Sequence, residues 1–478
     1  MGLQNKGSPI KISLAKLQFD QEATVIDLQR ETDALASWPT AERLRALQRI
    51  IPRARVEEVL AQTGHDRVVC RRLPGWFMVW FVIALGLCCR DCYRQIFRWL
   101  QPFRPGAVPG RSTLCEARRR LGIGPLRRLA EVVIQLLGQP DTPGAFYRGM
   151  RLMALDGFVL DVADTEANER AFGRPGSGRA PGAFPQVRVL ALCETGSHVL
   201  WRFLLKPIKH AEVSMARYLL RFMQKDMLLL WDRHFLTHAH VSAVLAQEAH
   251  LLARITSNRV FEPIAVLADG SYLAKLYRNS TDRRRDRHGL VVRIIEYTFD
   301  DPQWPGAGER HRLLTTLLDA ELDPATTLIS LYHERWEEEL TIDELKTHQR
   351  ERPVLRSQTP AGVVQEIYGL LLAHYLVRVL MYDAAATRHL DPQRLSFTAT
   401  LKILRCRLPE CPASERGGQR WYRRLVQEVA EEVIEPRRHR INPRVIKRKM
   451  SKWPKKRPIH RHPPQPTKPF EEAIVMCH

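Results

Sequence analysis

The first third of the chain shows a helical pattern of hydrophobic and polar residues. From residue 40 to residue 136, apolar positions recur at helical spacing, and prolines at 74, 102, 105 and 109 punctuate the pattern. The longest apolar run, residues 75–89, is short for a membrane span and has charge on both sides, so we expect a buried helix there. The pattern predicts an N-terminal helical domain over residues 41–140, after a lead-in over residues 1–40.

Short, continuously apolar runs in the middle of the chain predict a buried sheet. Residues 153–156 and 227–232 each have the pattern of a strand that ends on an aspartate, Asp156 and Asp232. Residues 168–186, rich in Gly, Pro and Arg, predict a loop after the first strand. The other predicted elements are strands at 187–193, 198–205 and 252–256, and helices at 211–224 and 237–252.

The order of these elements predicts an α/β fold. Three strands, a helix, a strand, a helix and a strand fit the ribonuclease-H-like fold, a mixed sheet with helices on both faces. Its first and fourth strands lie side by side. If those two strands are adjacent and parallel, Asp156 and Asp232 leave the sheet in the same region. Residues 150–257 are therefore expected to form the first part of this domain.

The pattern changes to strands and turns over residues 258–323, which predicts a β-rich insertion. Its expected strands are residues 261–268, 271–277 and 291–299.

Helical spacing returns over residues 324–406, the second part of the interrupted domain. Asp323 followed by Pro324 is typical of a helix start. Further helices are predicted at 359–382, which we expect to pack on the sheet, at 392–406, and at 420–434 within a C-terminal helical segment, residues 407–435. Residues 436–478 form a basic tail, whose many Lys, Arg and Pro residues cannot bury a core and predict disorder when free.

One helical stretch, residues 332–346, carries a row of functional groups. At about 100° per residue, Tyr332, Arg335, Glu339 and Lys346 fall within roughly 60° of one another on the helix surface. A solvated face with a single Arg–Glu pair is the structural alternative. The row also suits phosphate chemistry, because guanidinium and ammonium groups bind phosphate oxygens and a carboxylate binds Mg²⁺.

The spacing of this row favours the second interpretation. Tyr, two residues, Arg, three residues, Glu, six residues and Lys is the signature of insertion-sequence-4-type DDE transposases, and the chain resembles that family at all four positions. The apolar segment 73–100 also resembles the family's N-terminal domain, and residues 269–277, DGSYLAKLY, are similar to the family. The resemblance implies a DNA transposase with a ribonuclease-H-like catalytic core that is interrupted by a β-rich insertion.

The same resemblance implies a catalytic, metal-binding triad of Asp156, Asp232 and Glu339. Asp156 opens a DG…DT…N pattern that continues at Asp164-Thr165 and Asn168. Asp232 stands where the family has its second aspartate. From the residues alone, Asp156 could be only a turn former, and Asp232 could be only the cap of the next helix.

Several neighbouring carboxylates compete with the triad. Asp161 and Asp164 lie close to Asp156, and we expect them to be supporting residues. Glu337 and Glu338 point off the row of functional groups, and Asp343 does not have the signature spacing.

Tyr332, Arg335 and Lys346 are expected to bind DNA phosphates near the cleaved end, together with Arg233 beside Asp232. Some related transposases stack a flipped base on an aromatic residue of the insertion. Trp304 is the tryptophan of that segment, and it could equally be a packed side chain.

Composition favours a nucleic-acid partner over a membrane surface. Lys and Arg exceed Asp and Glu by 74 to 52, which gives a net charge of +22. A basic helix with Ser112 as its candidate cap and Arg118, Arg119 and Arg120 as close-set cations is expected to contact DNA. Nine cysteines without a secretion signal suggest reduced thiols in the cytoplasm.

The expected chemistry is metal-dependent cleavage of DNA followed by strand transfer. In-line attack on phosphorus needs charge neutralised on the attacking and leaving oxygens, which two Mg²⁺ ions held by three carboxylates would provide, with Mn²⁺ as a substitute. We expect a cytoplasmic, nucleoid-associated protein without membrane contact, which binds double-stranded DNA at the inverted repeats and the target as a homodimer. The family resemblance implies a cut-and-paste route. A metal-dependent nuclease without strand transfer and a catalytically silent DNA-binding relative are the alternatives.

Overall fold

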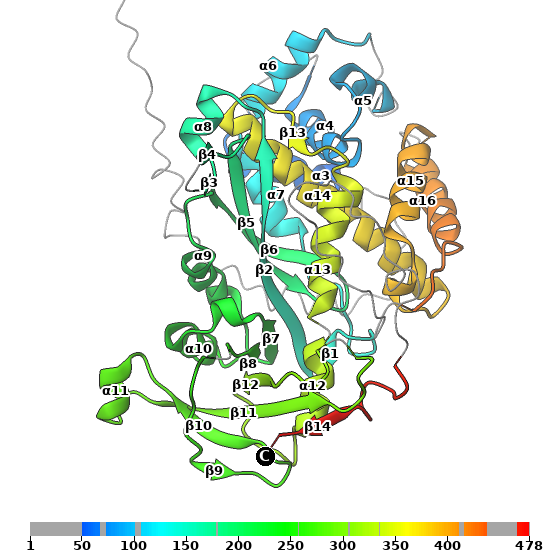
Figure 1. The fold of residues 1–478 in the computed structure, drawn as a ribbon. Helices are drawn as coiled ribbons and strands as arrows, with labels where there is room; N and C mark the ends of the chain where they lie inside the picture. The colour runs from blue at the N-terminus through cyan, green and yellow to red at the C-terminus, as the bar shows by residue number, and fades with distance from the viewer. Residues whose placement is uncertain are drawn as a thin grey trace, which may run out of the picture.

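A single large sheet forms the centre of the protein, with strand order β6-β5-β2-β7-β8-β12-β11-β10-β9 (Figure 1). The computed structural model describes residues 50–66, 73–100, 107–177, 180–256, 258–304, 306–333, 335–410, 415–436 and 466–477. The predicted lead-in, residues 1–40, therefore lies outside the described residues, as does the part of the predicted tail between residues 437 and 465.

The strands of this sheet have the following bounds. They are β2 (Met150–Val162), β5 (Gln186–Glu194), β6 (Val199–Pro207), β7 (Met227–Trp231), β8 (His250–Arg254), β9 (Ala265–Val266), β10 (Tyr272–Leu276), β11 (Leu290–Phe299) and β12 (His311–Thr315). Three short strands join its sides, namely β1 (Phe146–Tyr147), β13 (Val354–Leu355) and β14 (Ile474–Met476). A separate hairpin is formed by β3 (Gly176–Ser177) and β4 (Ala180–Pro181).

The middle of the sheet confirms the predicted ribonuclease-H-like arrangement. Leaving aside the two-residue β1, the first strand β2 pairs antiparallel with β5 and parallel with the fourth strand β7. β7 continues parallel to β8. Asp156, predicted at the end of its strand, instead lies in the middle of the 13-residue β2. The five-residue β7 ends much earlier, so the parallel pairing stops one residue before Asp156.

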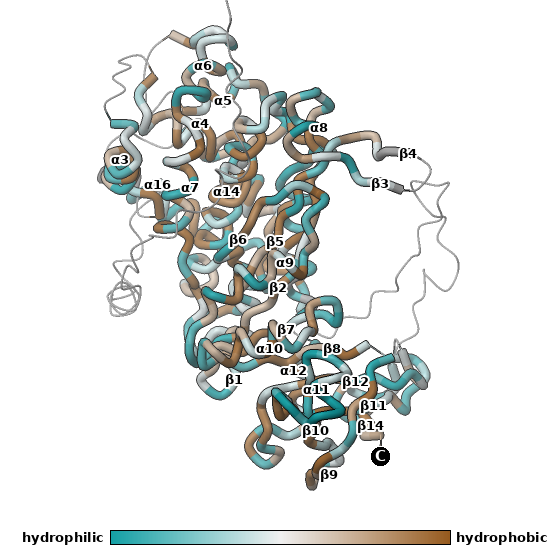
Figure 2. Tube along the Cα trace, turned by 90° about the vertical axis from the view of Figure 1, so that its left-hand side faces the viewer, coloured by the Kyte–Doolittle hydropathy of each residue, from teal (hydrophilic) through white to brown (hydrophobic). Residues whose placement is uncertain are grey.

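Helices cover both faces of this part of the sheet. One face carries α9 (Glu212–Leu219) and α10 (His238–Leu245), and the other carries α12 (Ala325–His333), α13 (Trp336–Asp343) and α14 (Pro360–Thr387). Successive strand residues point to opposite faces. Leu155 accordingly clusters with Met215 of α9, whereas Phe158 and Leu160 cluster with residues of α13 and α14. Hydrophobic residues are concentrated along α14 and the neighbouring strands (Figure 2).

The N-terminal helical domain is confirmed within the described residues, and it packs on α14. Its helices are α3 (Arg53–Gln62), α4 (Gly75–Leu87), α5 (Tyr93–Trp99), α6 (Arg111–Leu121) and α7 (Gly124–Val133). α4 is buried, as predicted. Among the described helices, α14 alone has the length and apolar composition of a membrane span, but 89% of its apolar window is buried inside the protein, as in a core helix.

The C-terminal helices also pack on α14 (Figure 1). They are α15 (Phe397–Arg407) and α16 (Glu415–Val429), close to the predicted ranges. Short helical turns complete the chain at η4 (Leu220–Phe222), η5 (Arg233–Phe235), η7 (Pro392–Arg394) and η8 (Leu408–Glu410), with a five-residue helix α11 (Ser280–Arg284) between β10 and β11.

The predicted tail is not disordered at its end. Residues 466–477 fold onto the β-rich segment, where β14 pairs antiparallel with β11. Asp301 Oδ2 accepts hydrogen bonds from the backbone nitrogens of Thr467, at 2.6 Å, and Lys468, at 3.1 Å. Phe470 is buried against Phe299 and Trp304. The prediction of disorder is therefore wrong for these residues, because a short apolar segment completes the edge of a sheet that forms far away in sequence.

Two local predictions fail where the chain changes element sooner than its pattern suggests. The helix predicted over residues 237–252 ends at Leu245, and β8 already begins at His250. The loop predicted over residues 168–186 contains the end of α8 (Glu166–Phe172) and the β3–β4 hairpin.

Two predicted helix caps are also wrong. Ser112 lies inside α6, whose first residue is preceded by Gly110. The carboxylate of Asp323 accepts hydrogen bonds from Tyr147, at 2.9 Å, and Arg148, at 2.7 Å. The first residue of α12 instead donates its backbone N–H to Asp269 Oδ2 at 2.8 Å, so the cap comes from the β-rich segment.

The contact between α4 and α14 depends on two glycines, and this generates a prediction. A Cβ atom on Gly86 would lie closer than 3.0 Å to the backbone of Gly369, and one on Gly369 would lie equally close to Val82. We expect Gly86→Ala and Gly369→Ala each to lower the free energy of unfolding by about 1–3 kcal/mol or more, since neither backbone can move away cheaply. Urea denaturation measures this.

Gly176→Ala is the matched control, because nothing lies within 4 Å of the added methyl group. Equal stability of all three variants would contradict the close packing of α4 on α14.

Candidate active site

The two aspartates of the predicted triad lie at the same level of the sheet. In the parallel register of β2 and β7, Leu155 stands opposite Trp231, so Asp156 and Asp232 are the next residues on neighbouring strands. Paired strands lie about 4.8 Å apart, which places both carboxylates at one site. Asp156 shares its face of β2 with Phe158, and this is the face that α13 and α14 cover.

The helical stretch that carries the signature residues is not one regular helix. α12 ends at His333 and α13 begins at Trp336, and a π-helix, Glu344–Gln349, follows α13 directly. Arg335 lies at the junction, where its Nη2 donates to Glu339 Oε1 at 3.1 Å. The Arg335–Glu339 pair of the structural alternative is therefore present, and both side chains belong to the segment that faces Asp156.

Tyr332 connects α12 to the strand that ends beside Asp232. Its hydroxyl donates to the backbone carbonyl of Trp231 at 3.3 Å, and the side chain is buried. Burial raises the pKa of Tyr332 to about 12. This differs from the predicted phosphate contact, because a buried hydroxyl that already donates to the backbone positions the strand end.

The two aspartates have opposite electrostatic environments. The pKa of Asp156 is raised to about 6, chiefly by burial. The nearby Glu339 carboxylate also raises this pKa, and the Arg335 guanidinium lowers it. Burial also acts on Asp232, but the backbone N–H of Arg233, the charge of Arg335 and His234, whose Nδ1 lies 3.0 Å from Asp232 Oδ2, together hold its pKa below the ordinary value. Arg335 therefore acts on all three carboxylates of the triad.

Lys346 lies on the π-helix, half-buried beside the same site. Burial lowers the pKa of Lys346, and the neighbouring Arg350 lowers it further, whereas Asp161, Asp343 and Asp156 oppose the shift. Lys346 is thus within electrostatic range of Asp156. π-Helical segments of this kind are frequent at functional sites.

The competing carboxylates have structural partners. Asp161 accepts a hydrogen bond from Gln186 at 2.7 Å, and Asp164 pairs with Arg174. Glu337 is buried with its Oε2 3.0 Å from His198 Nε2. Asp343 is exposed and accepts from Thr347 at 2.5 Å. The side chain of Glu338 lies outside the described residues.

Other sequence candidates have structural contacts as well. Asn168, from the DG…DT…N pattern, is buried and donates to the carbonyls of Ala163 and Ser357. The ring N–H of Trp304 donates to the carbonyl of Lys468 at 3.2 Å, and the ring stacks on Phe299, so it is a packed residue. Thr237, and not Asp232, caps α10 through its side chain. Arg233 is exposed beside Asp232.

Sequence reasoning missed one further carboxylate, Glu212 at the start of α9. A Cβ atom on Gly157 would lie 2.8 Å from Glu212 Oε1, so this carboxylate packs directly against the residue after Asp156. Arg188 of β5 forms an ion pair with it. Glu212 adds to the raised pKa of Asp156. No motif or spacing marks Glu212, because only the packing of α9 on the sheet brings it there.

The predicted triad would provide hard oxygen donors, which suit a divalent cation such as Mg²⁺. Within the described residues, no group of three His, Cys, Asp or Glu side chains is drawn together tightly enough to form a ready metal cluster. Burial is the main cause of the raised pKa of Asp156, and the Glu339 and Glu212 carboxylates add to it. The donor set and the charge balance both fit a site that gains from a cation.

A ribonuclease-H-like sheet that brings two aspartates together beneath a helix bearing a glutamate defines the DDE class of DNA-processing enzymes. Comparisons with known proteins agree with this class. Residues 41–131 match the family described as insertion element 4 transposase N-terminal, and residues 147–376 match the transposase DDE domain. The chain belongs to the insertion-element-4 family of DDE transposases, and it is an insertion-sequence DNA transposase.

Two relatives from Escherichia coli (strain K12) are similar to this chain. The transposase InsG for insertion sequence element IS4 is 31% identical over 412 residues, which cover 84% of this chain and 91% of InsG. The putative transposase InsZ is 25% identical over 190 residues, which cover 39% of this chain and 62% of InsZ.

Among solved structures, a piggyBac transposase synaptic complex with hairpin DNA matches with a TM-score of 0.39 and 12% identity. The match covers 79% of this chain and 77% of that one. Membership of the family establishes enzymatic transposase activity, DNA as a partner and dependence on a divalent metal ion.

The opposite environments of the two aspartates generate a prediction for the metal-free protein. The pKa of Asp156 in the folded protein is raised above its ordinary value of 3.8. The folded protein therefore loses stability progressively as the pH rises from about 4 to about 6 and Asp156 becomes charged. Asp156→Asn should therefore stabilise the metal-free protein at pH 7 by about 1–3 kcal/mol, and by nothing at pH 4.

Asp232→Asn is the matched comparison and should have the opposite sign. The pKa of Asp232 is lowered, so its charge contributes stability above its ordinary pKa, which is lost as the pH falls. Urea denaturation in EDTA at pH 4 and pH 7 measures both effects. Destabilisation of the Asp156→Asn variant at pH 7 would contradict the assigned environment.

Proposed function

We propose that this transposase binds the terminal inverted repeats of its own element and excises it by Mg²⁺-dependent DNA cleavage and strand transfer. The observation that carries the proposal is the parallel pairing of β2 with β7, which presents Asp156 and Asp232 on adjacent strands beneath the Arg335–Glu339 pair. Excision would follow a cut-and-paste route.

In this proposal, Asp156, Asp232 and Glu339 hold two Mg²⁺ ions, with Mn²⁺ as a substitute. When bound, the ions supply charge neutralisation at the attacking and leaving oxygens of the scissile phosphate. The two aspartates differ in the pH range over which they can hold a cation. The pKa of Asp232 is lowered and that of Asp156 is raised to about 6, so protonation of Asp156 should oppose metal binding as the pH falls towards 6.

Arg335 has a second role in the proposed reaction. Its guanidinium holds Glu339 in place and offsets the charge of both aspartates before DNA arrives. Once cations are bound, the guanidinium can direct two of its N–H donors towards a phosphate of the DNA backbone. Its planar, forked shape matches the phosphate oxygens. Lys346 and Arg233 are proposed as further phosphate contacts, and Tyr332 as the residue that positions the end of β7.

Recognition of the element ends is proposed to involve the N-terminal domain and the β-rich segment. Of the three cations predicted to contact DNA from α6, Arg118 is not available, because it is buried and donates to the hydroxyl of Tyr93 and the carbonyl of Gly362. Arg119 and Arg120 are exposed. At the opposite end of the molecule, the basic helix α11 projects from the sheet (Figure 1).

The pairing of two element ends favours a homodimer in the DNA complex, although each chain contains its own triad. A protein that acts on chromosomal DNA is also expected to be nucleoid-associated and to make no membrane contact. Both statements rest on the proposed reaction with DNA.

The proposal predicts that wild-type protein cleaves a labelled duplex carrying the element's own flanking end, in the presence of Mg²⁺. Asp156→Asn, Asp232→Asn and Glu339→Gln should each lower the cleavage rate by about 10³-fold or more, because each removes an oxygen donor of a metal ion. Binding to the same DNA, followed by gel shift, should be retained.

Asp343→Asn is the control, because this exposed carboxylate lies on the same helix but has Thr347 and His348 as partners. Loss of activity in this variant to the same extent as in Glu339→Gln would contradict the assignment. Cleavage without a target-joined product would identify a nuclease that lacks strand transfer, and binding without cleavage under several metals would identify a silent DNA-binding protein.

A further inference from the structure

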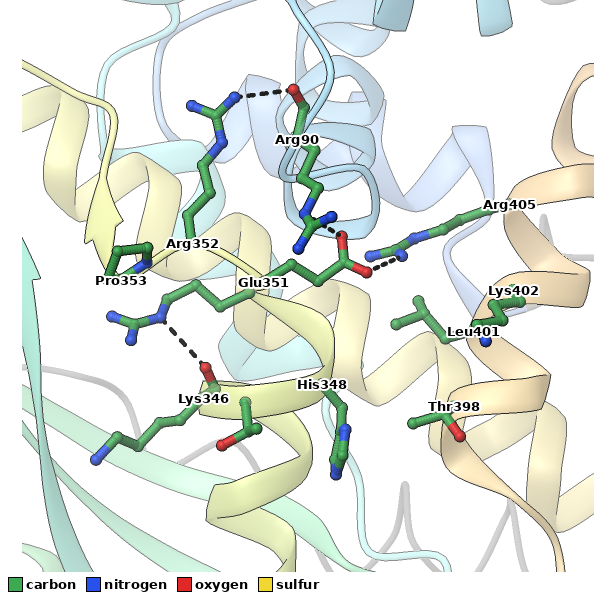
Figure 3. Close-up of a pocket in the computed structure, with 12 residues that line it drawn as sticks. Arg90, Lys346, His348, Glu351, Arg352, Pro353, Thr398, Leu401, Lys402 and Arg405 are labelled. Atoms are coloured by element: carbon green, nitrogen blue, oxygen red, sulfur yellow. Dashed lines mark hydrogen bonds and ion pairs between the residues drawn. The ribbon is translucent and has the colours of Figure 1, made fainter. Parts of the chain in front are cut away.

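A hollow of about 580 Å³ lies next to the candidate active site, with which it shares Lys346. Three segments that are distant in sequence form its walls (Figure 3). They are the loop after α4, which provides Arg90, the π-helix with the turn that follows it, residues 346–353, and one side of α15, which provides Thr398, Leu401 and Lys402. The hollow is thus a junction of the N-terminal domain, the catalytic domain and the C-terminal helices.

The charge of this hollow is strongly positive. Its lining contains one carboxylate, Glu351, and six cationic side chains, which are Arg90, Lys346, Arg350, Arg352, Lys402 and Arg405. Glu351 is already shared between two of the cations, since its Oε1 accepts from Arg405 at 2.9 Å and its Oε2 lies 3.7 Å from Arg90. Four cations therefore remain in the lining without compensation from this carboxylate.

Arg350 is a cation of the lining whose side chain is only partly satisfied by the protein. Its Nη1 atom is buried and has no hydrogen-bond partner within the described part of the chain. Its Nε makes one long hydrogen bond of 3.4 Å to the carbonyl of Lys346. A buried donor without an acceptor costs free energy, and such a group in a native structure calls for a ligand or a water molecule.

The backbone that holds these cations is strained. Glu351 has a φ of 53°, in the left-handed region that non-glycine residues seldom adopt. This turn lies just after the π-helix, and Glu351 there pairs with Arg90 and Arg405 (Figure 3). Arg350 and Arg352, on either side of Glu351 in the sequence, belong to the lining. Backbone strain of this kind is concentrated at functional segments.

We propose that this hollow binds the phosphate backbone of a DNA strand that adjoins the scissile phosphate. The inference rests on the proposed function, because Lys346 belongs both to the hollow and to the field around Asp156. A strand held by Arg350, Arg352 and Lys402 would therefore continue towards the triad. Two sources share this chemistry, the DNA that flanks the element before cleavage and the target DNA before joining.

Charge reversal at the exposed cations of the hollow tests this inference. Lys402→Glu, alone and combined with Arg352→Glu, is compared with Lys225→Glu, an exposed lysine before β7 that pairs with Glu248 at 3.7 Å. β7 carries Asp232 at its other end, so the control lies away from the site. The DNA probes are an element end with flanking duplex, a pre-cleaved end without flank, and a pre-cleaved end with a target plasmid.

With one of the three DNA probes, we expect the charge-reversal variants to lose about 10-fold or more of binding or joining at constant salt. The dependence of log affinity on log salt should fall by about one per phosphate contact removed. Loss with the flanked end alone identifies flanking DNA, and loss of joining to the plasmid alone identifies target DNA. Binding of the pre-cleaved end without flank should be unchanged.

Two results would overturn the inference. One is behaviour of the Lys402→Glu and double variants that matches Lys225→Glu with every probe. The other is an equal loss with all three probes, which would indicate a general electrostatic effect. If wild-type protein neither cleaves nor joins DNA, the proposed function fails, and the salt dependence of its binding to the flanked duplex still decides whether the hollow holds a phosphate backbone.

Discussion

The parallel register between β2 and β7 is the constraint on which the rest of the site depends. Leu155 and Trp231 are the last registered pair, and both aspartates follow it immediately. A slip of one residue would turn Asp156 to the opposite face of the sheet, since side chains alternate along a strand. The buried cluster on each face prevents such a slip, because Leu155 and Phe158 pack against helices on opposite sides. Hydrophobic packing thus fixes the position of a charged pair.

This arrangement gathers negative charge where the protein alone cannot neutralise it. Burial and two nearby carboxylates leave Asp156 with a raised pKa, while Asp232 is stabilised by His234 and a backbone N–H. A single guanidinium, that of Arg335, acts on both aspartates and on Glu339. The ionised form of Asp156 is therefore disfavoured in the folded protein, unlike that of a carboxylate in a fully paired structural ion pair. This is expected of a site that is completed by cations.

Sequence patterns predicted the parts of the fold that depend on local chemistry. Short apolar runs located β2 and β7 together with Asp156 and Asp232, and helical spacing placed Arg335 and Glu339 close enough for the contact that the structure contains. Failures arose where distant segments compete with a local preference. The cap of α12 comes from Asp269, 56 residues earlier, and the chain end becomes a strand only because β11 offers it an edge. Neither partner can be predicted from the residues that neighbour each segment in the sequence.

The row of signature residues shows why correct spacing does not by itself give correct geometry. A regular helix would align Tyr332, Arg335, Glu339 and Lys346 along one face, with all four directed at the same phosphates. Tyr332 instead lies near the end of α12 with its hydroxyl on the carbonyl of Trp231, and Lys346 lies on the π-helix that follows α13. The same departure from regular helix places Arg350 and Arg352 in the basic hollow. One irregular segment thereby contacts the strand end beside Asp232, holds Glu339 and supplies cations to the basic hollow. A straight helix could not do all three.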